Sequence, residues 1–316
     1  MSRIFKIPAE LASPALRSAL AFLLLAFVFG PIRSAAQYIP DRGWEWQNPL
    51  PQGNSINAIQ FTNDKRNGWA IGADGVILRT RNGGFEWEEQ ESPVSSTLYG
   101  LHVKDKARAV IVGSRGVVLT TRNGGRSWTL RATGINDHLF SIDFAPDDPL
   151  RGWAVGTLGA IIVTTDGGVT WKSQNAGTTA HLFSVAFVDG KTGIAVGSRG
   201  TILVTDDAGG QWKPHSATGN ATLTSVAFSS SKRAVVVGYG GTILVTDDRG
   251  ATWRSLESLV TTDLLSVFFR DEKLGWAVGD GGVVLTTGDG GSIWLPVNVR
   301  TGPKLITVHF VDEFLG

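Results

Sequence analysis

Seven tryptophans recur at nearly constant spacing along this sequence of 316 residues. Trp46 is followed, at intervals of 41, 41, 43, 41, 41 and 41 residues, by Trp87, Trp128, Trp171, Trp212, Trp253 and Trp294. A fixed period of this length predicts a repeat protein, in which each copy buries its apolar face against the next copy. The period therefore constrains the fold of almost the whole chain.

The residues before the last six tryptophans are also alike. A glycine lies three residues before each tryptophan, and an Asn or Asp lies five residues before it: Asn82, Asn123, Asp166, Asp207, Asp248 and Asp289. We expect the Asn or Asp side chain to close a turn by accepting backbone N–H groups two or three residues on. We expect the tryptophan to fold back between neighbouring units. The motif is predicted to be structural, because each turn has at most one carboxylate at this position and calcium needs six or more oxygens.

Each unit contains four short apolar stretches separated by turn residues. In the fourth unit, strands are predicted at Leu182–Phe187, Gly193–Gly197 and Thr201–Thr205, and a fourth strand is predicted to begin at Trp212. Short strands with Gly and Asp turns between them are typical of β-hairpins. Four strands in about 41 residues predict one blade of a β-propeller.

The predicted fold is therefore all-β, a β-propeller with seven blades. Six blades are complete four-stranded repeats, and the seventh is split between the two ends of the chain. The strand at Trp46 would be its outer strand and residues 305–310 its first strand, which leaves few exposed strand edges. Because no stretch after Phe310 corresponds to the second strand at Trp276–Gly279, we expect the seventh blade to be truncated.

The first 36 residues have the layout of a secretory signal. Cations at Arg3, Lys6 and Arg17 precede an apolar run over residues 19–29, and small residues follow at 34–36. The run is too short to cross a bilayer core of about 30 Å. We predict a signal peptide over 1–36 and a propeller over 37–316, and an uncleaved anchor is the alternative. The predicted protein is exported, periplasmic or extracellular, without direct membrane insertion after cleavage.

Composition excludes several chemistries. The chain has no Cys, which rules out disulfides, Cys-ligated zinc and thiol catalysis. A balance of 29 Lys and Arg against 28 Asp and Glu gives no support for a nucleic-acid partner. The five His residues show no short metal-ligand spacing, so neither a metal site nor a cofactor is predicted.

Few residues are candidates for catalysis. Glycoside hydrolysis needs two carboxylates about 5–9.5 Å apart. Asp74, Asp143 and Asp280 lie outside the repeated turns, and we expect them to be solvated. Sialidase chemistry needs a Tyr nucleophile and an arginine cluster, but Tyr99 and Tyr239 lie inside repeat units. We therefore predict that the protein is not an enzyme, with a carbohydrate-binding or glycoside-hydrolase-like propeller at the cell surface as the alternative.

Residues that break the repeat are the better candidates for function. In a propeller, the loops between second and third strands open on the same face as the connections between blades. These segments hold Arg115, Arg199, Tyr239, His138 and His181. Arg and aromatic side chains are favoured in protein interfaces. We predict that these five residues form a protein-binding face, and a merely solvated loop face is the alternative.

Two stretches resemble known families. The string Thr-x-Asp-x-Gly-x-Thr-Trp resembles the Asp-box of sialidases, sortilin-type receptors and some glucanases. The longer unit over Gly152–Trp171, whose Gly-Trp-Ala-Val-Gly string recurs at Gly275 and, with Ile for Val, at Gly68, resembles the photosystem II stability/assembly factor family over about residues 44–316. The resemblance implies a non-catalytic seven-bladed propeller, in the thylakoid lumen if the host is photosynthetic, that binds a membrane-protein complex under assembly. The family surface is rich in Arg, and Arg115 and Arg199 are the residues here that could match it.

Overall fold

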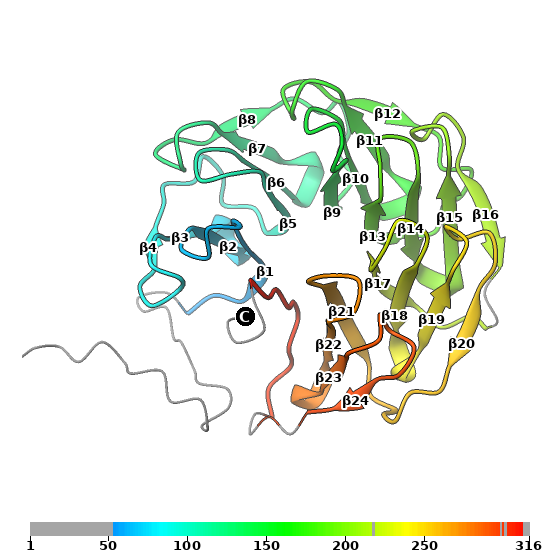
Figure 1. Ribbon diagram of the computed structural model, residues 1–316. Coiled ribbons are helices and arrows are strands. Elements are labelled where there is room, and N and C mark those ends of the chain that lie inside the picture. Colours follow the sequence, from blue (N-terminus) through cyan, green and yellow to red (C-terminus); the bar gives the residue numbers. More distant parts are fainter. Residues whose placement is uncertain (1–52, 217–218, 298, 300–301, 312–316) are drawn as a thin grey trace, which may run out of the picture. The chain divides into compact units, whose positions relative to one another are not determined.

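The computed structural model describes residues 53–216, 219–297, 299 and 302–311. These residues form six sheets of four antiparallel strands, arranged as the blades of a propeller (Figure 1). No α-helix occurs in the described ranges, where the helical elements are single 3-10 turns. The predicted signal peptide over 1–36 and the predicted strand at Trp46 lie outside the described residues.

We number the six described blades 1 to 6 along the chain, from β1–β4 to β21–β24. In every blade the strands run in sequence order from the inner to the outer strand. The inner strands are β1 (Ile56–Phe61), β5 (Leu98–Val103), β9 (Leu139–Phe144), β13 (Leu182–Phe187), β17 (Leu223–Phe228) and β21 (Leu264–Phe269). The second strands are β2 (Gly68–Gly72), β6 (Ala109–Gly113), β10 (Gly152–Gly156), β14 (Gly193–Gly197), β18 (Ala234–Gly238) and β22 (Gly275–Gly279). The third strands are β3 (Ile77–Thr80), β7 (Val118–Thr121), β11 (Ile161–Thr164), β15 (Thr201–Thr205), β19 (Ile243–Thr246) and β23 (Val284–Thr287). The outer strands are β4 (Glu88–Glu89), β8 (Thr129–Arg131), β12 (Lys172–Gln174), β16 (Lys213–Ser216), β20 (Arg254–Leu256) and β24 (Leu295–Pro296).

The predicted strands of the fourth unit are confirmed. The first three coincide with β13, β14 and β15, while β16 begins one residue later than expected, at Lys213. The difference arises because Trp212 turns away from the strand into the core between blades, where only 6% of its surface stays exposed. The second strand of each blade is buried along its full length. Blades 2 to 5 have a described blade on each side, and the segment after blade 6 packs on β22.

A glycine ends each second strand because the inner strand approaches it closely. At Gly197 the next residue, Ser198, donates its backbone N–H to the carbonyl oxygen of His181 at 2.9 Å. A Cβ on Gly197 would collide with that same carbonyl oxygen. The backbone at this position is extended, so the requirement is for space and not for a left-handed conformation.

The repeated tryptophans join neighbouring blades, as predicted. Trp212 of blade 4 packs with Trp153 and Val155 of blade 3, and Trp128 of blade 2 packs with Trp69 of blade 1. The same relationship to the preceding blade holds for Trp171, Trp253 and Trp294. Because a Trp buries about 150–250 Å² of surface, these contacts account for much of the core between blades. Trp87, in the first described blade, packs on its own blade and edge-on to Phe61.

The Asp-box turn is closed by two side chains. Asp166 accepts N–H groups from Val169 and Thr170, each at 2.9 Å, three and four residues on and so one residue later than predicted. The hydroxyl of Thr164 donates to Asp166 and accepts the N–H of Gly168 at 3.0 Å. Partial burial opposes ionisation, but the hydrogen bonds from Thr170, Thr164 and Val169 prevail and lower the pKa of Asp166 to about 2.

The segment after blade 6 lies between the last and first described blades. His309 packs against Phe61 of β1 and Phe268 of β21, with ring centroids 6.2 and 4.7 Å apart. Phe310 stacks on Trp276 of β22 at 3.8 Å. This is the place expected for the first strand of a seventh blade, although residues 302–311 form no ladder with the described strands.

Candidate functional site

The ends of the strands form two faces with different contents. We call turn face the end that carries the 3-10 turns between second and third strands, together with the connections between blades. These turns are η2 (Ala73–Gly75), η3 (Ser114–Gly116), η4 (Thr157–Gly159), η5 (Ser198–Gly200), η6 (Tyr239–Gly241) and η7 (Asp280–Gly282). We call Asp-box face the opposite end, where the loops between inner and second strands lie beside the Asp-box turns.

The middle residue of each 3-10 turn has a left-handed backbone. Four of the six are not glycine: Asp74, Arg115, Leu158 and Arg199 have φ of 54°, 55°, 53° and 57°. A side chain in this conformation costs about 1 kcal/mol. At the glycines of the other two turns, Gly240 and Gly281, an added Cβ would meet no atom within 4 Å. Side chains at this position therefore project into solvent, and Leu158 is 64% exposed.

The two arginines of these turns keep their hydrogen-bond donors available. Arg115 and Arg199 are both exposed, and neither forms an ion pair with a described residue. Each guanidinium carries five N–H donors in a planar arrangement that suits carboxylates and carbonyl oxygens. Tyr239, which begins the corresponding turn of blade 5, is 46% exposed. Three of the five predicted binding residues thus present free side chains on the turn face.

The two predicted histidines lie on the same face, where His138 is half-buried and His181 is exposed. His181 accepts the backbone N–H of Leu158 on Nδ1 at 3.1 Å, which links the turn of blade 3 to blade 4. His138 packs edge-on to Tyr99, 6.5 Å between ring centroids, and its Nδ1 is buried without a hydrogen-bond partner. The structure thus brings His138 to an aromatic neighbour that the sequence interpretation did not include.

An aromatic cluster lies where the inner strands reach the turn face. Tyr99, Phe140 and Phe183 are half-buried and contact one another in series, with ring centroids 5.3 and 5.5 Å apart. Each is the second residue of an inner strand, and each falls at an irregularity where the pairing skips one residue. Such a bulge redirects a side chain out of the regular alternation. Their common position in the repeat was the signal that could have identified them.

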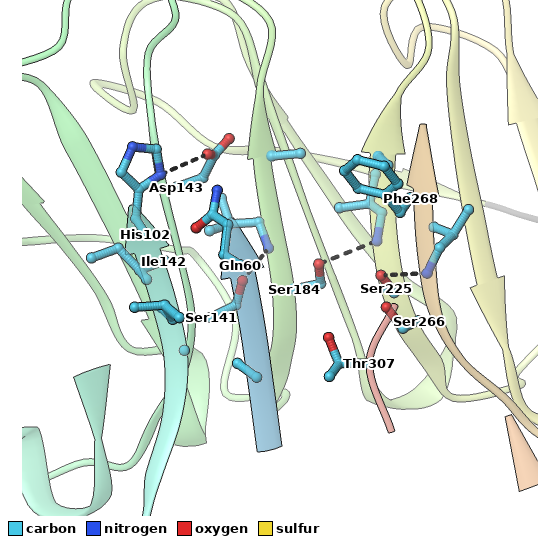
Figure 2. Close-up of a pocket in the computed structure, with 18 of the residues that line it drawn as sticks. Gln60, His102, Ser141, Ile142, Asp143, Ser184, Ser225, Ser266, Phe268 and Thr307 are labelled. Atoms are coloured by element: carbon cyan, nitrogen blue, oxygen red, sulfur yellow. Dashed lines mark hydrogen bonds and ion pairs between the residues drawn. The ribbon is translucent and has the colours of Figure 1, made fainter. Parts of the chain in front are cut away.

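A central channel of about 550 Å³ runs between the inner strands (Figure 2). Around it, Ser141, Ser184 and Ser225 each accept the backbone N–H of an inner-strand valine in the next blade, at 3.1–3.3 Å. These serines connect blades and recur, with Ser266, at intervals of 43, 41 and 41 residues. The sequence interpretation missed them, although the spacing was readable.

Asp143 is not the solvated carboxylate that the sequence predicted. Its Oδ2 accepts the backbone N–H of Phe187 at 2.9 Å, and its Oδ1 lies 3.6 Å from Nδ1 of His102. Asp280 pairs with Lys304 at 3.1 Å, whereas Asp74 is exposed. Among the described residues that line the channel, Asp143 is the only carboxylate, so the second carboxylate of a glycosidase is missing there.

Two further findings concern metals and membranes. No group of three His, Asp or Glu residues in the described ranges could hold a metal ion. No helix in the described part of the chain has the length and apolar character needed to span a membrane.

Comparison with known proteins gives consistent similarities. The profile of the family described as photosynthesis system II assembly factor YCF48 matches residues 39–130, 86–173, 131–214 and 170–259, together more than half of the chain. A solved structure of YCF48 bound to D1 peptide is 24% identical, with a TM-score of 0.65 over 79% of this chain and 82% of that chain. YCF48 from Cyanidioschyzon merolae is 23% identical, with a TM-score of 0.64 over 79% and 87%.

A glycoside hydrolase shares the fold only. An ancestral GH74 enzyme matches with a TM-score of 0.62 at 14% identity, over 77% of this chain but 37% of that chain. Comparison with curated proteins gave no match.

Proposed function

This chain belongs to the photosynthesis system II assembly factor YCF48 family, and we propose that it is a non-catalytic scaffold that binds a protein partner through its turn face. The observation that carries the proposal is the left-handed conformation of Arg115 and Arg199. Glycine occupies the same place in two other turns without loss of packing, so stability does not require these side chains. Their conformational cost is best explained by a role in recognition.

The surroundings of the two arginines support a protein ligand. The aromatic cluster of Tyr99, Phe140 and Phe183 lies on the same face, with exposed Leu158 and Tyr239 at nearby turns. Arg, Tyr and Phe are enriched in protein interfaces, where the rings supply apolar contact and the guanidinium supplies directed hydrogen bonds. This combination suits a peptide with apolar side chains and acceptor oxygens.

We base the proposed partner on a solved relative and the proposed location on the N-terminal segment. One solved relative carries a D1 peptide, so a segment of a membrane complex under assembly is the proposed ligand class. Such a segment would meet the propeller outside the cytoplasm if residues 1–36 act as a secretory signal. The proposed location is therefore periplasmic or extracellular, or the thylakoid lumen in a photosynthetic host.

A direct binding measurement tests the proposal. Fluorescence anisotropy with a labelled D1 peptide would compare the wild type with the double variant Arg115→Glu/Arg199→Glu. We expect at least about a tenfold loss of affinity, since charge reversal removes two charge-assisted contacts. The matched control is Lys191→Glu/Lys273→Glu, which makes the same charge change on the Asp-box face. Equal affinity of the turn-face variant and the wild type would refute the proposed site.

A further inference from the structure

The Asp-box face of blades 1 and 2 carries a concentration of positive charge. We call basic corner the loops 62–67 and 81–86 of blade 1 and 104–108 and 122–127 of blade 2. It contains eight cations, Lys65, Arg66, Arg81, Lys104, Lys106, Arg108, Arg122 and Arg126, and three carboxylates, Asp64, Glu86 and Asp105. The corresponding loops of blades 3–6 together hold seven cations and eleven carboxylates. These loops are residues 145–151, 165–170, 188–192, 206–211, 229–233, 247–252, 270–274 and 288–293. The excess charge is therefore +5 over two blades and −4 over the other four.

Three positions of the Asp-box itself differ together in these two blades. The first is the acceptor that closes the turn, which is neutral Asn82 and Asn123 in place of Asp. Both still accept the N–H four residues on, at 3.0 and 3.1 Å, so the turn requires an oxygen and not a charge. The two missing carboxylates increase the positive excess of the corner.

The second and third positions lie beside the turn. Six residues before the tryptophan, blades 1 and 2 have Arg81 and Arg122, where the other blades have Thr, Asp, Asp and Gly. Two residues before it they have Phe85 and Arg126, where the others have Val, Gly, Ala and Ser. Phe85 is 61% exposed and Arg126 is also exposed. A large aromatic side chain thus projects from a surface of cations.

Hydrogen bonds to backbone carbonyls make the corner one continuous surface. Gly83 of the blade 1 turn donates its N–H to the carbonyl of Arg66 at 2.9 Å, and Gly124 of the blade 2 turn donates to Ala107 at 2.9 Å. Arg79 of β3 reaches the carbonyl of Lys106 at 3.0 Å, which joins the two blades. The four loops are therefore neighbours held by the fold.

Some of these cations already have partners inside or beside the corner. Arg108 pairs with Asp105 at 2.6 Å, and Arg81 pairs with Glu88 of β4. The Nζ of Lys104 donates to the carbonyl of Pro149 at 2.7 Å. Burial, with Arg108 nearby, lowers the pKa of Lys104, as expected where cations crowd. Arg122 and Arg126 form no ion pair with a described residue, which makes them the side chains best placed for an external anion.

We propose that the basic corner docks on anionic lipid headgroups at a membrane surface, with Phe85 entering the interfacial layer. Clustered Lys and Arg bind anionic bilayers electrostatically, and an aromatic residue among them adds apolar contact at headgroup depth. The exposed Phe85 favours a lipid surface over an acidic peptide, because an acidic peptide supplies charge but no apolar layer. This surface is on the face opposite Arg115 and Arg199, so the inference does not depend on the proposed function.

Vesicle co-sedimentation of the full chain tests the inference. Phosphatidylcholine vesicles with and without phosphatidylglycerol would be compared for the wild type, Arg122→Glu/Arg126→Glu and Phe85→Ser. The matched controls on the same face are Lys191→Glu/Lys273→Glu for charge and Ile293→Ser for an exposed apolar residue, 63% exposed. Every protein carries the same N-terminal segment, so its contribution to membrane binding cancels.

We expect phosphatidylglycerol-dependent binding that weakens with salt and falls more than about tenfold in Arg122→Glu/Arg126→Glu, at about fivefold per cation. Phe85→Ser should weaken it several-fold, while both controls stay within about twofold. The proposal fails if the wild type does not prefer anionic vesicles, or if the charge control loses as much as the corner variant. It also fails if a soluble polyglutamate peptide binds as tightly as the vesicles and Phe85→Ser has no effect. D1 peptide affinity should not change in Arg122→Glu/Arg126→Glu, which separates this result from a failure of the proposed function.

Discussion

The indole nitrogen of Trp128 donates a hydrogen bond to Oε1 of Gln90 at 3.2 Å, across the boundary between blades 2 and 1. The same oxygen accepts the indole N–H of Trp69 at 3.1 Å, and Nε2 of Gln90 donates to the carbonyl of Gly124 at 3.1 Å. One amide therefore satisfies two indoles and a backbone carbonyl where two blades meet. Gln174 makes a similar connection from blade 3 to Trp212 and Ala208 of blade 4.

Loss of this amide should destabilise the propeller. In Gln90→Ala, two indole N–H groups and one carbonyl lose their partner, at about 1 kcal/mol each, the low end of the range for buried groups, because these bonds are only partly buried. We expect the free energy of unfolding to fall by about 2–4 kcal/mol in urea denaturation. Gln211→Ala, at an exposed position in the blade 4 turn, is the control and should change it by less than about 0.5 kcal/mol. A Gln90→Ala protein as stable as this control would show that the Gln90 amide does not stabilise the boundary between blades 1 and 2.

The Asp-box turn should tolerate an amide but not a methyl group. Asp166→Asn keeps an oxygen for the N–H groups of Val169 and Thr170, as Asn123 does in blade 2. We expect that variant to lose only the part of the stability that depends on the charge, at most about 1 kcal/mol at neutral pH for a partly exposed group, and Asp166→Ala to lose about 2 kcal/mol. Urea denaturation at neutral pH measures both. Equal losses would mean that the charge, and not the acceptor, closes the turn.

Acid should unfold the protein through carboxylates held in turns. The pKa of Asp271 is lowered to about 2 by N–H groups of Leu274 and Lys273 and by Arg270, and hydrogen bonds lower that of Asp166 to the same value. The folded state therefore binds fewer protons than the unfolded state, in which the ordinary value is 3.8. Stability is fully present above about pH 4 and is lost as the pH falls towards 2. The free energy of unfolding, measured by urea denaturation between about pH 4 and pH 2, should depend less on pH in Asp166→Asn than in the wild type.

His309 should make stability depend on pH in a second, less acidic range. Its burial lowers the pKa from 6.5 to about 4, because a charged imidazole is disfavoured between Phe61 and Phe268. The unfolded chain then binds the proton first, so stability is complete above pH 6.5 and falls as the pH is lowered to 4, by at most about 3 kcal/mol. We expect His309→Leu to remove this slope from urea midpoints measured over that range. An unchanged slope would place its origin elsewhere.

Replacing the strained arginines by glycine should separate stability from binding. Glycine adopts the left-handed region without cost, although it gains entropy in the unfolded chain, so Arg115→Gly/Arg199→Gly should be unchanged or up to about 1 kcal/mol more stable. The same variant should bind a D1 peptide at least about tenfold more weakly. Thermal denaturation and anisotropy measure the two effects. A loss of stability would show that the side chains have a structural role.

The fold was largely predictable because its determinants repeat. The 41-residue spacing of Trp171, Trp212 and Trp253 predicted blades, and the Gly and Asp turns predicted the strand ends. What the sequence could not give is how one side chain reaches across a blade boundary. Gln90 and Asp143 reach partners 38 and 44 residues away, and that geometry exists only after the blades pack.

The candidate site was predicted only in part. The sequence identified Arg115 and Arg199 as breaks in the repeat, but their left-handed backbone becomes visible only in the folded turn. The basic corner was not predicted because its cations lie in four loops that are separate in the sequence and become neighbours only when blades 1 and 2 pack. In a single turn Asn82 or Asn123 is only a neutral variant of the motif, and the positive excess appears in the summed charge of the two adjacent blades.

The most direct test of a protein-binding turn face is hydrogen–deuterium exchange of the protein with and without a D1 peptide. We expect added protection in turns η3 to η6 and at the ends of β5, β9 and β13 that reach them, with the Asp-box turns unchanged. Protection confined to the Asp-box face, or none anywhere at a peptide concentration that saturates binding, would contradict peptide binding at the turn face.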